Sequence, residues 1–106
     1  MAVVAILAAL LSGLYGVVTR APTKPVCQVA MPCSAPYAHA TLVFSRPGLA
    51  AREVVADAKG RYRVALPPGH WSLRVQASRF GWTPRAVTVP RGRYGRVNVD
   101  VDTGIR

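Results

Sequence analysis

Residues 60–73 read GRYRVALPPGHWSL, and this stretch decides the fold of the chain. Apolar residues alternate with polar or small ones from Tyr62 to Leu66, and again from Trp71 onward. An alternation of period two is typical of a β-strand with one buried face and one wet face. Pro67-Pro68-Gly69 interrupts the pattern as a reversal of the chain would. We therefore expect two strands that place Tyr62 and Trp71 on one face of a hairpin.

The same period recurs along most of the chain and predicts further short strands. They fall at residues 38–44, 52–56, 86–89 and 96–102, with turn residues between them. Many short strands at regular spacing are typical of an antiparallel β-sandwich. The expected fold is all-β, a seven-stranded antiparallel sandwich preceded by one N-terminal hydrophobic helix. Its inward-facing residues would be Leu42, Phe44, Tyr62, Val64, Leu66, Trp71, Leu73, Val75, Val87, Val89, Val97, Val99 and Val101.

Residues 56–73, ADAKGRYRVALPPGHWSL, also carry a family resemblance. A turn with Asp57 and Gly60 leads through an aromatic strand to Leu66-Pro67-Pro68-Gly69, and an aromatic-x-Leu pattern follows. This order resembles the carboxypeptidase regulatory-like domain, a sandwich of the transthyretin (prealbumin) type, in a small bacterial secreted or membrane-attached form. The resemblance extends over residues 36–101. It implies a module used for folding, spacing or binding, with no catalytic residues to carry over.

The first residues of the chain are apolar and suggest a membrane-directed segment. Ala2–Val18 has 17 residues without a charge, and as a helix it would span about 25 Å. That length is slightly less than the hydrocarbon core of a bilayer, about 30 Å. A cleaved signal peptide, a retained anchor and a buried core helix remain as alternatives, and we favour the retained anchor. The expected organisation is a signal or anchor at 1–19, a Pro/Cys linker that would hold the first strand at 20–35, and the sandwich at 36–106.

Two cysteines lie close together in the predicted linker. Cys27 and Cys33 are separated by five residues, which is not the spacing of a thioredoxin-type motif. Outside the cytoplasm a local disulfide is the natural pairing, and two free thiols in a reducing compartment are the alternative. The cysteines therefore favour an extracytoplasmic location, whereas Arg20 and Lys24 after the apolar run favour the opposite orientation. We give the cysteines slightly more weight than the charges, so an extracytoplasmic location, membrane-anchored or secreted, is expected.

The chain is strongly basic. It has 14 Lys and Arg against four Asp and Glu, for a formal net charge of +10. Such a surface attracts nucleic acid, anionic lipid headgroups or acidic polymers of the cell envelope. Twelve of the cations are arginine, and they are scattered, so a biased genome is the simpler explanation of their number.

The inventory of catalytic side chains is small. The chain has two His, one Glu and three Asp, so neither an acid/base pair nor a metal site is expected. His70 and Ser72 would share a strand face without an acid beside them. Asp100 and Asp102 lie two residues apart, which could provide half of a Ca²⁺ site, although solvated carboxylates are the simpler interpretation. We expect no enzyme activity, no cofactor, no metal and no small-molecule substrate.

Residues 78–84 form a predicted loop with aromatic and basic side chains. Arg79, Phe80, Trp82 and Arg85 are therefore candidate contacts for lipid, sugar or a protein partner. In the alternative interpretation, Phe80 and Trp82 cap the end of the sandwich. The expected function is a non-enzymatic, extracytoplasmic module with a structural or protein-binding role at the cell envelope, held at the membrane by residues 2–18. The alternative is a cationic binder of an anionic envelope polymer or nucleic acid.

Overall fold

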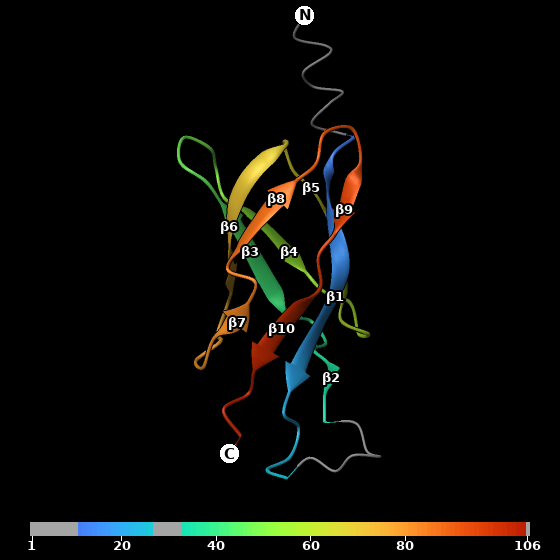
Figure 1. Ribbon diagram of the computed structural model, residues 1–106, viewed down its shortest axis with the longest axis vertical. Helices are drawn as coiled ribbons and strands as arrows, with labels where there is room; N and C mark the ends of the chain where they lie inside the picture. Colours follow the sequence, from blue (N-terminus) through green and yellow to red (C-terminus); the bar gives the residue numbers. More distant parts are fainter. Residues whose placement is uncertain (1–10, 27–32, 106) are drawn as a thin grey trace, which may run out of the picture.

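A computed structural model of the chain describes residues 11–26 and 33–105 (Figure 1). These residues form an all-β structure of two sheets that face one another. Ten strands are present in this part of the chain: β1 Gly13–Ala21, β2 Ala35–Pro36, β3 Thr41–Ser45, β4 Arg52–Val55, β5 Arg61–Ala65, β6 Gly69–Val75, β7 Trp82–Thr83, β8 Ala86–Val89, β9 Tyr94–Arg96 and β10 Val99–Asp102.

Strand β1 is the longest strand and the centre of the first sheet. Its first half lies between β5, which is antiparallel to it, and β9, which is parallel. Its second half lies between β2 and the parallel strand β10, and β7 extends the sheet beyond β10. We call the end where β1 begins the proximal end and the end where β1 stops the distal end (Figure 1).

The second sheet is simpler. Its order is β4-β3-β6-β8, and every neighbouring pair is antiparallel. Strand β6 shows the alternation that the sequence predicts, because Trp71, Leu73 and Val75 are buried while the residues between them are exposed. The buried face of each strand packs toward the first sheet, as expected for a sandwich.

The core fills the space between the two sheets. Twelve of the thirteen predicted inward residues belong to it, and the thirteenth, Val97, is half-buried against it. Leu14 and Val18 of β1 are fully buried, together with Ala40 and Ala56 at strand ends. The rings of Phe44 and Tyr62 lie 6.3 Å apart between their centroids, so aromatic packing joins the sheets. Burial raises the pKa of the Tyr62 hydroxyl, which donates a hydrogen bond to the carbonyl of Val97.

The turn before β5 forms as its sequence predicts. The carboxylate of Asp57 accepts hydrogen bonds from the backbone N–H groups of Lys59 and Arg61, at 2.9 and 2.8 Å. Gly60 has a φ of 78°, which favours glycine, and its carbonyl accepts a bond from the N–H of Val18 at 2.7 Å. The turn is therefore fixed to β1 as well as to β5.

The predicted N-terminal helix is wrong where the structure describes it. Residues 13–18, assigned to that helix, are part of β1, where residues 13–17 pair with β5 and residues 13–15 also pair with β9. The apolar run misled the helix prediction because Leu14 and Val18 face the core of the sandwich rather than lipid. The β-structure begins at Gly13, well before residue 36, and residues 2–10 lie outside the described residues. No helix in the described part of the chain could cross a membrane.

The predicted strand number and one predicted pairing also need correction. The described residues form ten strands rather than seven, because β1, β2, β7 and β9 carry little or no alternation of their own. Strands β5 and β6 do not form a hairpin: β5 pairs with β1, whereas β6 pairs with β3 and β8. The Pro-Pro-Gly segment 67–69 therefore carries the chain from one sheet to the other. Tyr62 and Trp71 are both buried, but they belong to opposite sheets.

Candidate functional site

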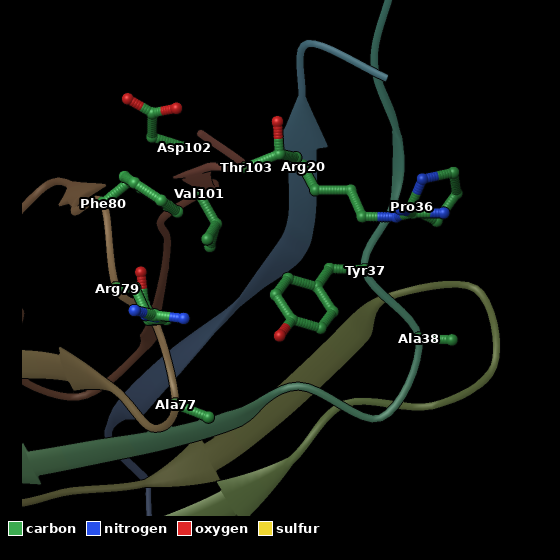
Figure 2. A pocket seen from close by; sticks show the side chains of 11 residues that line it. Arg20, Pro36, Tyr37, Ala38, Ala77, Arg79, Phe80, Val101, Asp102 and Thr103 are labelled. Atoms are coloured by element: carbon green, nitrogen blue, oxygen red, sulfur yellow. The ribbon is translucent and has the colours of Figure 1, made fainter. Parts of the chain in front are cut away.

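The distal end of the sandwich holds an open pocket of about 440 Å³, which we call the distal pocket. Figure 2 shows its lining: Tyr37 lies on one side, and Phe80 and Val101 lie on the other. The lining residues come from four segments that are far apart in the sequence. They are Arg20, Pro36, Tyr37, Ala38, Ala77, Ser78, Arg79, Phe80, Val101, Asp102 and Thr103.

The loop between β6 and β7 places Phe80 at the pocket. Ala77 and Gly81 have φ values of 65° and 105°, so the chain reverses tightly around residues 78–80. The Ser78 hydroxyl closes this turn by donating to the carbonyl of Gly81 at 3.2 Å. The same carbonyl accepts a hydrogen bond from the N–H of Asp102 at 3.0 Å, which fastens the loop to β10.

The end of the described chain supplies the next wall of the pocket. Thr103 donates its hydroxyl to the carbonyl of Pro22 at 2.6 Å, and its N–H bonds to Ala21 at 3.1 Å. Asp102 accepts the N–H of Gly104 at 2.8 Å. The ring of Phe80 lies directly against Gly104, which has no side chain and a φ of 79°. Phe80 is still 56% exposed, so one face of its ring is available to a ligand.

Trp82 and Arg85 lie beside a second opening, next to the distal pocket. This opening shares Phe80, Val101 and Asp102 with the distal pocket. The indole N–H of Trp82 donates to the carbonyl of Leu73 at 2.9 Å, so this ring is held against the second sheet. The guanidinium of Arg85 lies 4.5 Å from the ring centroid of Trp82, within the range of a cation–π contact. Trp82 therefore caps the sandwich, whereas Phe80 is exposed.

The electrostatics of the distal pocket favour an anion beside an apolar group. Arg20, Arg79 and Asp102 line the pocket, so its charged side chains have a net positive charge, and neither guanidinium is ion-paired within residues 11–26 and 33–105. Tyr37, Phe80 and Val101 supply apolar surface between them. Arginine binds carboxylate through two parallel hydrogen bonds, which gives the pocket a preference for acidic ligands.

Three of the four carboxylates, those of Asp57, Asp100 and Asp102, accept hydrogen bonds from the protein. Asp57 holds the turn before β5, and hydrogen bonding from the backbone of Arg61 lowers the pKa of its carboxyl. Asp100 accepts the hydroxyl of Thr19 at 2.6 Å. The imidazole of His70 lies 3.0 Å from the hydroxyl of Thr88, across two strands of the second sheet. None of these contacts joins a histidine to a carboxylate, as a catalytic triad would require.

Metal ligation finds no support in the described part of the chain. No group of three His, Cys, Asp or Glu side chains gathers there in a way that could hold an ion. Asp100 and Asp102 do lie on one strand, but each is hydrogen-bonded to the protein. No buried polar side-chain atom of the described residues lacks a hydrogen-bond partner, so no orphaned group points to a missing ligand.

The sequence-based candidates gather at the distal end, in two groups. Arg79 and Phe80 line the distal pocket, while Trp82 and Arg85 line the neighbouring opening. Cys33 also lies near this end, with its Sγ 4.0 Å from the carbonyl oxygen of Lys24. The predicted bridge between Cys27 and Cys33 stays a prediction, because Cys27 lies outside the described residues.

Arg20, Tyr37 and Thr103 are among the pocket residues that the sequence did not predict. Arg20 comes from the end of β1, Tyr37 follows β2, and Thr103 follows β10. The alternation of period two gives no information on loops and strand ends, so Tyr37 and Thr103 carried no signal. Arg20 was hidden because the apolar run before it was assigned to a helix rather than to β1.

Comparison with known proteins assigns the chain to a family. The family model described as "carboxypeptidase regulatory-like domain" matches residues 13–102. The chain belongs to the carboxypeptidase regulatory-like domain family. The match begins at the first residue of β1 and ends at the last residue of β10, so it covers all ten strands of this domain.

A solved structure supports the fold of the domain. A DUF3823 family protein from Parabacteroides merdae is similar with a TM-score of 0.51 at 19% sequence identity. The similarity covers 84% of this chain but 44% of that one, so the chain spans less than half the length of its structural relative. No curated protein matches the chain. At this level of identity the likeness concerns the fold alone.

Proposed function

We propose that this carboxypeptidase regulatory-like domain is a non-catalytic module that binds a protein partner through the distal pocket. The observation that carries the proposal is the position of Phe80. Its ring is 56% exposed beside an opening of about 440 Å³ whose flanking residues Arg20 and Arg79 are not ion-paired among the described residues. Exposed aromatics and arginines are enriched where proteins bind one another.

The pocket chemistry defines the partner. An apolar side chain would enter between Tyr37 and Phe80, and an adjacent carboxylate would meet Arg79 or Arg20. The partner is therefore an acidic segment with one apolar anchor residue. The structural roles of Asp57 and Asp100 support a module without chemistry of its own.

A photoreactive residue placed at position 80 of the full chain tests this proposal in the native host. We expect one discrete protein adduct from position 80. The matched control places the same residue at position 74, which is exposed on the outer face of the second sheet. The substitution Arg79→Glu should remove the adduct. An equal pattern of adducts from both positions, or turnover of ester or peptide substrates by the pure chain, would contradict the proposal.

We further propose that the module works at the cell envelope, outside the cytoplasm. The apolar residues 2–10 support membrane targeting, and the closely spaced cysteines support an oxidising compartment. Since residues 13–18 belong to β1, any membrane-directed segment lies before Gly13. The intact mass of the protein isolated from its host shows whether the N-terminal segment is retained. Alkylation of the thiols before and after reduction shows whether the cysteines are oxidised. Two thiols that react only after reduction are expected. Thiols that react directly would contradict the location.

A further inference from the structure

Two arginines and a tyrosine form a row across the outer face of the first sheet. Tyr15 of β1 is in register with Arg63 of β5 on one side and with Arg96 of β9 on the other. Residues in register on adjacent strands share a face, so the three side chains lie side by side. All three are exposed, and Tyr15 is 40% accessible. Neither arginine of the row has an ion-pair partner among the described residues.

The row continues to the proximal end of the sandwich. The guanidinium of Arg63 lies 3.9 Å from the ring centroid of Tyr94, at the start of β9. The turn that precedes Tyr94 adds Arg91 and Arg93, which are exposed. Tyr94 is in register with Gly13, so this turn lies level with the beginning of β1 (Figure 1). We call Arg63, Arg91, Arg93 and Arg96 the proximal arginines.

The acidic residues lie elsewhere. Asp100 and Asp102 are in register with Thr19 and Ala21, at the distal end of β1. Asp57 belongs to the turn that packs against Val18, and it is already paired with Arg61. The fourth acidic residue, Glu53, is in β4 of the other sheet. On the first sheet, the proximal end therefore carries the arginines, while the carboxylates of the described residues lie toward the distal end.

Two exposed leucines lie at the same end. Leu11 is 59% exposed immediately before β1, and Leu49 is 50% exposed in the loop between β3 and β4. That loop is fastened to the proximal end, because Arg46 donates from Nη1 to the carbonyl of Pro68 at 3.1 Å. Nearby, the N–H of Leu66 bonds to the carbonyl of Ser12 at 3.1 Å. The apolar residues 2–10 precede this end in the chain.

We propose that the proximal end docks on a phospholipid membrane surface that contains anionic headgroups. Arginines without ion-pair partners among the described residues, with Tyr15 beside them and exposed Leu11 and Leu49 at the same end, match the charge and polarity of such an interface. The proposal rests on the membrane targeting proposed above, but not on the distal pocket. The two ends would then serve different contacts, with lipid at one end and the protein partner at the other.

Co-flotation of the full chain with lipid vesicles tests the docking. One set of vesicles contains phosphatidylcholine alone, and the other contains about 30% phosphatidylglycerol. Arg93→Gln with Arg96→Gln removes two proximal charges, and Lys59→Gln with Arg74→Gln is the matched control. Both control residues are exposed, the two variants have the same net charge, and neither control residue belongs to the distal pocket. Near-ultraviolet circular dichroism from Trp71 and Trp82 verifies that each variant is folded.

The wild-type chain should bind anionic vesicles more tightly than neutral ones. Each cation near an anionic surface contributes about fivefold, so removing two should cost the proximal variant about 25-fold on anionic vesicles and nothing on neutral ones. The control should lose less than about threefold. Equal losses in both variants, or binding independent of lipid charge, would overturn the proposal. So would preferential binding of a single-stranded oligonucleotide that depends on Arg93 and Arg96. Failure to bind neutral vesicles at all would contradict only the targeting by residues 2–10.

Discussion

Strands β1 and β6 both lie in the interior of their sheets, yet only the sequence of β6 shows the alternation of apolar and polar residues that predicts a strand. In β6, buried Trp71, Leu73 and Val75 alternate with exposed polar residues. In β1, the outward positions hold Tyr15 and Val17, so both faces of the strand are apolar. The comparison teaches that the period of two can be read only when the outer face of a strand is polar.

The difference has a functional consequence as well. Strand β1 joins the two ends of the molecule, since Tyr15 lies among the proximal arginines and Arg20 lines the distal pocket. Strand β6 contributes its outer face to neither. A central strand that serves both ends fixes their distance and orientation, because it is paired along its whole length, with β5 in its first half and with β10 in its second.

The largest expected effect follows from Gly16→Val in β1. A Cβ at this position would collide with the backbone carbonyl of Val97, which accepts the Tyr62 hydroxyl and belongs to a residue whose N–H bonds to Tyr15. We expect a loss of about 4 kcal/mol or more, and with it the cooperative thermal transition. Gly48→Asn is the control, because nothing lies within 4 Å of that site and asparagine tolerates a positive φ. If Gly16→Val shows the same cooperative thermal transition as the wild type, β1 is not part of the sandwich.

A more graded comparison truncates one leucine in each strand. Leu14 of β1 is 0% exposed and Leu73 of β6 is 3% exposed. Leu14→Ala and Leu73→Ala should each lower the free energy of unfolding by about 3 kcal/mol, measured by urea denaturation. An unchanged free energy for Leu14→Ala alone would mean that the two strands are not equivalent members of one core.

The smallest expected effect concerns the turn between β4 and β5, which is hydrogen-bonded to β1. Hydrogen bonding from the backbone of Arg61 holds the pKa of the Asp57 carboxyl below its ordinary value of about 3.9. The ionised group is therefore stabilising above that value, and its contribution is lost as the pH falls through the lowered pKa. Asp57→Asn should lower the melting temperature slightly at pH 7. A difference between variant and wild type that persists unchanged at pH 2 would contradict this origin.

The sequence predicted the second sheet well and the first sheet poorly. Strands β6 and β8 alternate in burial as predicted, and all four strands of this sheet overlap stretches that the sequence assigned to strands. Strands β2 and β7 have two residues each, which is too short for any period to appear. Strand β9 consists of Tyr94-Gly95-Arg96, whose glycine weakens the pattern. The pairing of β5 was harder still to predict. The residues Pro67-Pro68-Gly69 are equally compatible with a hairpin turn and with a connection between two sheets.

The candidate site could be predicted only in part, for a similar reason. Arg79, Phe80, Trp82 and Arg85 are neighbours in sequence, so their joint exposure at a loop could be inferred from residues 78–84. Tyr37 and Thr103 reach the pocket through the pairing of β2 and β10 with β1. Since that pairing was hidden by the apolar character of β1, the opposite wall of the pocket was hidden too.

Hydrogen exchange of the full chain tests the central claim most directly, which is that residues 13–21 form the central strand of the first sheet. The amides of β1 that pair with β5 and β10 should exchange as slowly as those of β6, at a rate set by global unfolding. Rapid exchange of residues 13–21, while β6 remains protected, would contradict the account.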